Sequence, residues 1–180
     1  LERVAQQIAS AVVTLLQARE SALYRLDPAS GALVCIGSAG DAGARQWVGR
    51  ALRRGEGVAG RAVLQRQVVA SSHFLRDPGI TVPRWLEQRA EDEGFGSVMA
   101  VPLVTRDRVI GALALADTEG RTYTDHERQL LIGLGDQAAI AIENARLFEE
   151  SDRRRRAAEA LTEVGRLVSA SLEPGEVAEQ

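Results

Sequence analysis

The sequence predicts an α+β fold: a central antiparallel sheet of five or six strands, flanking helices, and a long helix at each end. Two β-prone runs around a Pro/Gly turn, at 21–27 and 32–38, predict one hairpin. The runs 97–104 and 109–117, joined by a polar turn, predict a second hairpin. Adjacent hairpins indicate antiparallel pairing, whereas a doubly wound parallel sheet requires strands that alternate with helices.

Helices are predicted before, between and after these hairpins. Residues 1–16 carry apolar side chains at intervals of three and four, as an amphipathic helix does. Shorter helices are expected at 57–67 and 84–93. Thr124 or Asp125 can cap a long C-terminal helix, because both side chains accept hydrogen bonds from first-turn amides.

The C-terminal helix carries two apolar stripes, although a helix that packs on a sheet needs only one. The second stripe has a heptad spacing, which indicates the same helix of a second copy. We therefore expect a homodimer through the terminal helices. The interface residues predicted from the second stripe and its continuation are Ile140, Leu147, Leu161, Val164 and Val168.

Composition narrows the function classes. The chain has 180 residues and a net charge of −3, so a broadly basic nucleic-acid-binding surface is not expected. No apolar run reaches the roughly 18 residues of a membrane span, so no membrane contact by this segment is expected. One cysteine, Cys35, excludes a disulfide framework, and with two histidines it leaves little material for a metal site.

Three segments resemble the GAF domain family: LRRGEGVAGRAVLQRQVV (52–69), FGSVMAVPLVTRDRVIGALALAD (95–117) and YTDHERQLLIGLGDQAAIAIENARLFEE (123–150). The resemblance implies a GAF/PAS-like sensor domain over 1–150. It also implies a place in a cytoplasmic bacterial signalling protein, such as a two-component sensor histidine kinase, with an output domain in the same chain.

The remaining residues are expected to lead into a further domain. The charged stretch 151–172 is predicted to be a helical signalling linker. Residues 173–180 resemble the beginning of the domain, since EVAEQ (176–180) is similar to RVAQQ (3–7). A second GAF domain is therefore predicted to begin there.

The resemblance implies a ligand cavity between the sheet and the segment 68–95. Strand alternation places Leu113 and Leu115 on one face and the alanines 112, 114 and 116 on the other. Because small side chains let a helix approach closely, the alanine face is expected under the C-terminal helix and the leucine face in the cavity. The predicted pocket residues are Tyr24, His73, Phe74, Trp85, Met99, Leu113 and Leu115.

The sequence identifies no ligand and no cofactor. Cyclic-nucleotide members use a lysine, which this chain lacks, and bilin-binding members pair a cysteine with a histidine, which Cys35 lacks. His73 is either a ligand contact or a surface histidine, and Arg61, near a helix start, could meet an anion. The alternatives to a sensor are a dimerising spacer without ligand and an enzyme. Sulfoxide-reducing members need several cysteines, which disfavours the enzyme.

Overall fold

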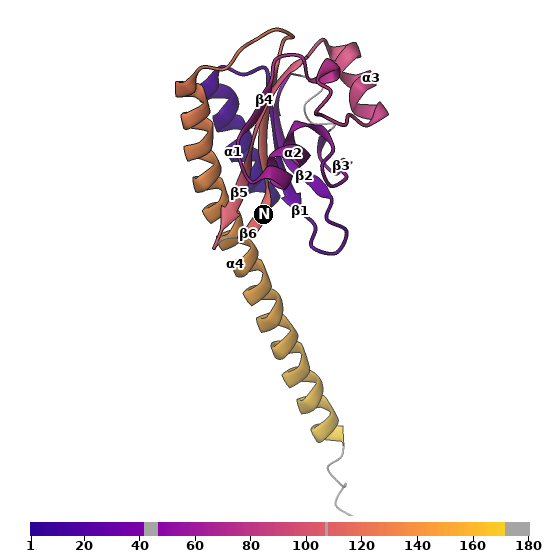
Figure 1. The fold of residues 1–180 in the computed structure, drawn as a ribbon. Coiled ribbons are helices and arrows are strands. Elements are labelled where there is room, and N and C mark those ends of the chain that lie inside the picture. Colours follow the sequence, from indigo (N-terminus) through magenta and orange to yellow (C-terminus); the bar gives the residue numbers. More distant parts are fainter. Residues whose placement is uncertain (42–46, 107, 172–180) are drawn as a thin grey trace, which may run out of the picture. The chain divides into compact units, whose positions relative to one another are not determined.

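The computed structural model describes residues 1–41, 47–106 and 108–171, and the side chains of this range up to residue 161. The expected new start at 173–180, and the side chains of Val164 and Val168, lie outside these described residues. The elements follow one another as α1 (Glu2–Leu16), β1 (Glu20–Leu26), β2 (Leu33–Gly40), β3 (Ala51–Leu52), α2 (Gly57–Gln65), β4 (Val69–Ser71), the 3₁₀ turn η2 (Phe74–Arg76), α3 (Arg84–Glu93), β5 (Ser97–Thr105), β6 (Arg108–Asp117) and α4 (Asp125–Ser171), as Figure 1 shows.

The six strands form one sheet in the order β3-β2-β1-β6-β5-β4, and neighbouring strands are antiparallel. The two predicted hairpins are β1–β2 and β5–β6. They join through β1 and β6, where Tyr24 pairs with Ala112 and Leu23 with Leu113. The predicted α+β fold with a central antiparallel sheet is therefore confirmed.

Helices cover both faces of the sheet. α1 and the first turns of α4 lie over one face, while α2 and α3 lie over the other (Figure 1). On the first face Val12 of α1 and Leu131 and Ile142 of α4 are buried with the strand residues. On the second face Val58 of α2 and Leu86 of α3 belong to a separate apolar cluster.

The predicted assignment of the two faces of β6 is wrong. Leu113 and Leu115 pack under α1 and α4, whereas Ala112 and Ala114 face the cluster that includes α2. The reason lies in the helices, which present small residues to the sheet at Ala5, Ala9, Ala138 and Ala139, all at most 1% exposed. Large strand residues fill the space that these alanines leave, because interiors pack to a constant density.

A capping box starts α4. Thr124 Oγ1 accepts a hydrogen bond from the amide of Glu127 at 3.2 Å, and Glu127 accepts one from the amide of Thr124 at 2.7 Å. Of the two predicted caps, Thr124 is the one used. Glu127 is held ionised by these contacts and by Arg121, which lower its pKa to about 2.

The chain divides into two compact units, the first being Leu1–Glu143, which contains the whole sheet. The second begins at Asn144, where α4 continues with charges spaced one turn apart. Arg146 pairs with Glu150 at 3.1 Å and Arg155 with Glu159 at 2.8 Å, contacts that stabilise a helix on its own. Within the described parts of the chain, none of the helices combines the length and apolarity of a membrane span.

Candidate functional site

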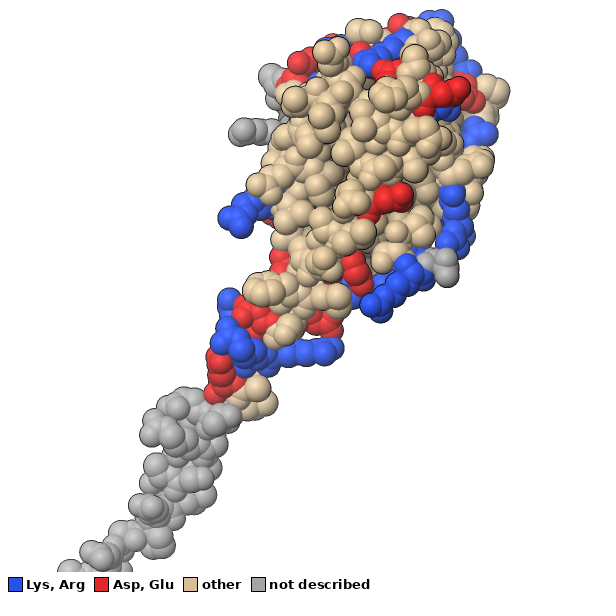
Figure 2. Space-filling model, turned by 90° about the vertical axis from the view of Figure 1, so that its left-hand side faces the viewer, with Lys and Arg blue, Asp and Glu red and all other residues tan. Residues whose placement is uncertain are grey.

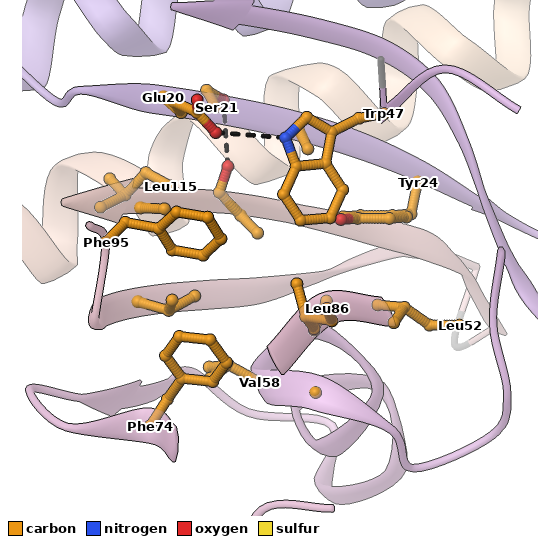
Figure 3. Close-up of a pocket in the computed structure, with 16 residues that line it drawn as sticks. Glu20, Ser21, Tyr24, Trp47, Leu52, Val58, Phe74, Leu86, Phe95 and Leu115 are labelled. Atoms are coloured by element: carbon orange, nitrogen blue, oxygen red, sulfur yellow. Dashed lines mark hydrogen bonds between the residues drawn. The ribbon is translucent and has the colours of Figure 1, made fainter. Parts of the chain in front are cut away.

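A pocket lies on the sheet face that α2 and α3 cover, and its free volume is about 50 Å³ (Figure 3). Strands, helices and connecting segments all contribute residues to its lining. The lining residues are Glu20, Ser21, Ala22, Tyr24, Trp47, Leu52, Gly57, Val58, Ala59, Phe74, Leu86, Phe95, Val98, Ala114, Leu115 and Ala116.

Small residues make room for the pocket. The neighbouring strands β1 and β6 present small side chains here, those of Ala22, Ala114 and Ala116. These side chains leave free space above the sheet. Gly57 opens α2 with a φ of +65°, a conformation that L side chains rarely adopt. Its amide donates to the carbonyl of Thr81 at 2.8 Å, which ties the start of α2 to the segment before α3. The glycine thus serves the chain turn at the pocket wall.

Aromatic rings form much of the wall. Tyr24, Trp47, Phe74 and Phe95 line the pocket, and they are four of the seven aromatic residues of the chain. Phe74 and Phe95 are stacked with centroids 5.9 Å apart, and Trp47 lies 6.1 Å from Phe95. Such ring pairs stabilise beyond their area burial, so the wall is held in place by its own packing.

A buried polar cluster closes one end of the pocket. The indole N–H of Trp47 donates to Glu20 Oε2 at 3.1 Å (Figure 3). Arg89 of α3 lies over the same ring, with its guanidinium carbon 3.8 Å from the centroid, and forms an ion pair with Glu93 at 2.8 Å. Burial raises the pKa of Glu20 to about 7, against the opposing field of Arg89. The hydrogen bonds from Arg89 lower the pKa of Glu93.

The structure brings some predicted pocket residues together and separates others. Tyr24 and Phe74 line the pocket, and Leu115 also contacts it although its side chain packs under the helices. Trp85 supports the wall from outside, edge-on to Trp47 with ring centroids 5.6 Å apart. Met99 and Leu113, both 0% exposed, belong to the core beneath α1 and α4. Their placement in the cavity is wrong, because it followed from the inverted strand faces.

The two predicted polar contacts lie elsewhere. His73 Nδ1 is 3.1 Å from Glu119, in an open polar cleft on the surface. Arg61 is 3.8 Å from Asp77, so its charge already has a partner. Neither residue lines the aromatic pocket.

Sequence reasoning missed Glu20, Trp47 and Phe95. Trp47 follows a glycine-rich polar stretch. A single tryptophan in such a stretch indicates a side chain that packs into the core and holds the segment in place. Glu20 is the first residue of β1, whose other residues are mostly apolar, so its burial could have been suspected. Neither residue belongs to a periodic pattern, which is the signal that the strand and helix predictions used.

The predicted dimer residues in the described range are exposed. Ile140 is 54%, Leu147 46% and Leu161 74% exposed within one copy of the chain. Among the described residues no group of three or more His, Cys, Asp or Glu side chains is arranged to hold a metal ion.

The comparisons with known proteins agree with this architecture. A GAF domain family model matches residues 1–143. The GAF domain of a phosphoenolpyruvate-protein phosphotransferase from Coxiella burnetii is 19% identical with a TM-score of 0.72, and the match covers 83% of this chain and 86% of that one. The second GAF domain of DevS from Mycobacterium smegmatis is 22% identical with a TM-score of 0.63, covering 85% and 97%.

An enzyme has the same fold. The type II free methionine-R-sulfoxide reductase from Thermoplasma acidophilum is 16% identical with a TM-score of 0.61, and the match covers 79% of this chain and 94% of that chain. At such identities the solved structures bear on the fold alone. The match of the family model over most of the chain shows the family itself: the chain belongs to the GAF domain family, whose members are typically sensory or regulatory modules of signalling proteins.

Proposed function

We propose that this chain is a non-catalytic sensory domain of a larger cytoplasmic signalling protein, such as a sensor histidine kinase. In this proposal a small molecule binds in the aromatic pocket, and two copies pair through α1 and α4. The helix beyond Glu143 then carries the signal to an output domain in the same chain. The observation that carries the proposal is a pocket lined by aromatic rings and one buried carboxylate.

The state of Cys35 argues against the sulfoxide-reductase alternative. The side chain is 1% exposed, and burial raises the pKa of its thiol to about 11. A thiol, not a thiolate, therefore predominates at neutral pH, whereas thiol exchange requires the thiolate. Since Cys35 is also the only cysteine, an intramolecular disulfide cannot form.

A dimerising spacer without ligand is the second candidate, and the size of the pocket favours it. Its volume of about 50 Å³ is below the roughly 300–1,000 Å³ of common ligand sites. Native mass spectrometry of protein purified from cells, followed by thermal unfolding with the molecules that co-purify, separates the two candidates. A ligand that binds the folded state raises the unfolding midpoint, and the proposal expects Ala114→Phe to remove that rise.

A protein that retains no molecule, and whose unfolding midpoint no added small molecule raises, would leave the spacer as the better account. Ala29→Phe is the matched control, because it adds the same side chain at an exposed position. It should keep the ligand-dependent rise. Circular dichroism of both variants shows whether the fold is retained.

The dimer proposal rests on a surface of the domain, on the α4 side, that carries few charged side chains. Figure 2 looks onto the α4 side, where a broad part of the domain carries few charged side chains. Ile140 is half exposed on α4, and Leu15 of α1 is 57% exposed. Burying such residues between two copies contributes about 25 cal/mol per Å² of apolar area.

The proposed dimer predicts that Leu161 of α4, which is 74% exposed in one copy, is buried between two copies. Leu161→Glu should weaken dimerisation about tenfold or more, because it places a charge in the apolar stripe, while the domain stays folded. Analytical ultracentrifugation over a concentration series measures this. Ala160→Glu, an exposed neighbour, is the matched control and should have a smaller effect. A monomer for the unmutated chain at high micromolar concentration would contradict the dimer.

A further inference from the structure

The carboxyl group of Glu20 is buried among Trp47, Arg89 and a second carboxyl group, that of Glu93. The side chain of Glu20 is 5% exposed and lines the pocket. Its one hydrogen bond of ordinary length comes from the uncharged indole of Trp47, at 3.1 Å. Arg89 Nη2 lies 3.4 and 3.5 Å from the two carboxylate oxygens, so that contact is long.

Arg89 is directed mainly to a different carboxylate. Its Nε and Nη2 donate to the two oxygens of Glu93 at 2.9 and 2.8 Å, which is the bidentate arrangement that guanidinium groups prefer. Arg19, which also acts on the pKa of Glu20, donates to Asp41 at 2.7 Å. Glu20 and Glu93 therefore share one close guanidinium, so this end of the pocket carries an excess of negative charge when both carboxyl groups are ionised.

Buried charge of this kind is costly unless a counter-charge compensates it. The raised pKa of Glu20 reports that cost. A positively charged group in the pocket would lower the cost of burying the Glu20 charge, whereas a phosphate or carboxylate would increase that cost. The charge balance therefore selects against anionic ligands.

The aromatic wall has the same preference. The faces of aromatic rings attract cations, and several rings around one space form the cages that hold methylated ammonium groups. Four rings line this pocket, together with the carboxylate. The guanidinium carbon of Arg89 lies 3.8 Å from the centroid of the Trp47 ring, so one cation already stacks on an aromatic ring of this wall.

The volume sets the scale of the ligand. A water molecule needs about 10–15 Å³ of such free volume. The pocket of about 50 Å³ thus has room for about three to five waters, which is the scale of a tetramethylammonium ion and too small for a nucleotide.

We propose that the pocket binds a small organic cation with a methylated ammonium group, whose charge lies beside Glu20 and whose methyl groups contact the aromatic rings. This inference rests on the proposed function, since it names the ligand class of the same pocket. Anions and uncharged molecules of equal size bind more weakly.

The test compares tetramethylammonium with tert-butanol, which has nearly the same shape and no charge. Each is titrated at about pH 8, where Glu20 is ionised, and the indole N–H signal of Trp47 is followed by NMR at constant ionic strength. We expect tetramethylammonium to bind at least tenfold more tightly. Glu20→Gln keeps an acceptor for Trp47 but removes the charge, and should reduce the preference to about threefold or less.

Glu91→Gln is the matched control, because Glu91 is an exposed residue of α3 and the change in net charge is the same. It should keep the preference. Equal or tighter binding of tert-butanol, or a preference that survives Glu20→Gln, overturns the cation assignment and leaves the pocket as a ligand site. Absence of binding by both probes counts against the pocket itself, and so against the proposed function as well.

Discussion

Glu20 occupies the first position of β1, with its backbone paired to Ala116 of β6 and to Gly40 of β2. This register holds the side chain over the pocket, where it meets the indole of Trp47. An ionised carboxylate in such a place destabilises the folded state, because burial disfavours its charged form. Polar groups retained at a cost in stability are typical of functional sites.

This cost predicts how stability depends on pH. The pKa of Glu20 is raised from 4.5 to about 7 by burial, with Glu93 adding to the rise and Arg89 and Arg19 opposing it. The folded state therefore binds the proton more tightly than the unfolded state. Its contribution to stability is fully present below about pH 4.5 and is lost as the pH rises through about 7.

Urea unfolding of the wild type and of Glu20→Gln over about pH 5–8 measures the effect. The wild type should lose about 2–3 kcal/mol relative to the variant across this range. Parallel pH profiles for the two proteins would show that the carboxylate is not buried as described.

Leu113 carries a prediction about the corrected faces of the sheet. It is 0% exposed beneath the helices, so Leu113→Ala should cost about 2–5 kcal/mol through lost burial and the cavity left behind. Leu64→Ala, the same change at a side chain 55% exposed, should cost under about 1 kcal/mol. Urea denaturation measures both. A small loss at Leu113 would mean that it does not pack in the main core.

At the scale of elements, Arg121 connects three of them. It donates to the carbonyls of Leu16 and Gln17 at the end of α1, at 3.1 and 3.3 Å. It also forms ion pairs with Asp117 at the end of β6 and with Glu127 in the first turn of α4, the latter at 2.7 Å. One side chain thus joins the end of α1 to the start of α4, close to the β1–β6 pair that carries Glu20.

Arg121→Ala should destabilise the domain by about 2–3 kcal/mol, because it leaves carboxylates and helix-end carbonyls without their donor. Thermal or urea unfolding measures the loss. Arg3→Ala, at an exposed position of α1, is the matched control and should change stability by less than about 0.5 kcal/mol. Equal effects of the two substitutions would contradict the connecting role of Arg121.

The elements themselves were predictable from the sequence because they follow periodic patterns. The helix expected at 84–93 is α3, and both hairpins form where alternation and turn residues indicated them. The faces of β6 were not predictable from strand alternation alone. Alternation separates Leu113 from Ala114 but does not say which face α1 and α4 cover, and that depends on the small residues these two helices present.

The pocket was less predictable than the fold. Tyr24 and Phe74 could be proposed because they lie on or beside strands. Trp47 and Glu20 act through contacts between segments distant in sequence, such as the contact of Arg89 with both of them. Pairings of that kind leave no local pattern in a single sequence.

At the scale of the whole molecule, the sheet and the pocket belong to the unit Leu1–Glu143, the same residues that the family model matches. From Asn144 onward, α4 is a helix supported by its own ion pairs. A self-supporting helix suits a linker that transmits a change of register or rotation between domains. The Leu161 variants test the dimer in which we propose that this linker acts.

In the proposed function the aromatic pocket is the sensory site of the domain. The most direct measurement is NMR of the isotope-labelled chain with the molecule retained from cells or, failing that, with tetramethylammonium. The account predicts that the largest shifts fall on Trp47, Glu20 and Ala114, and that Ala114→Phe abolishes them. Shifts centred on the cleft of His73 and Glu119 instead, or unaffected by Ala114→Phe, would contradict it.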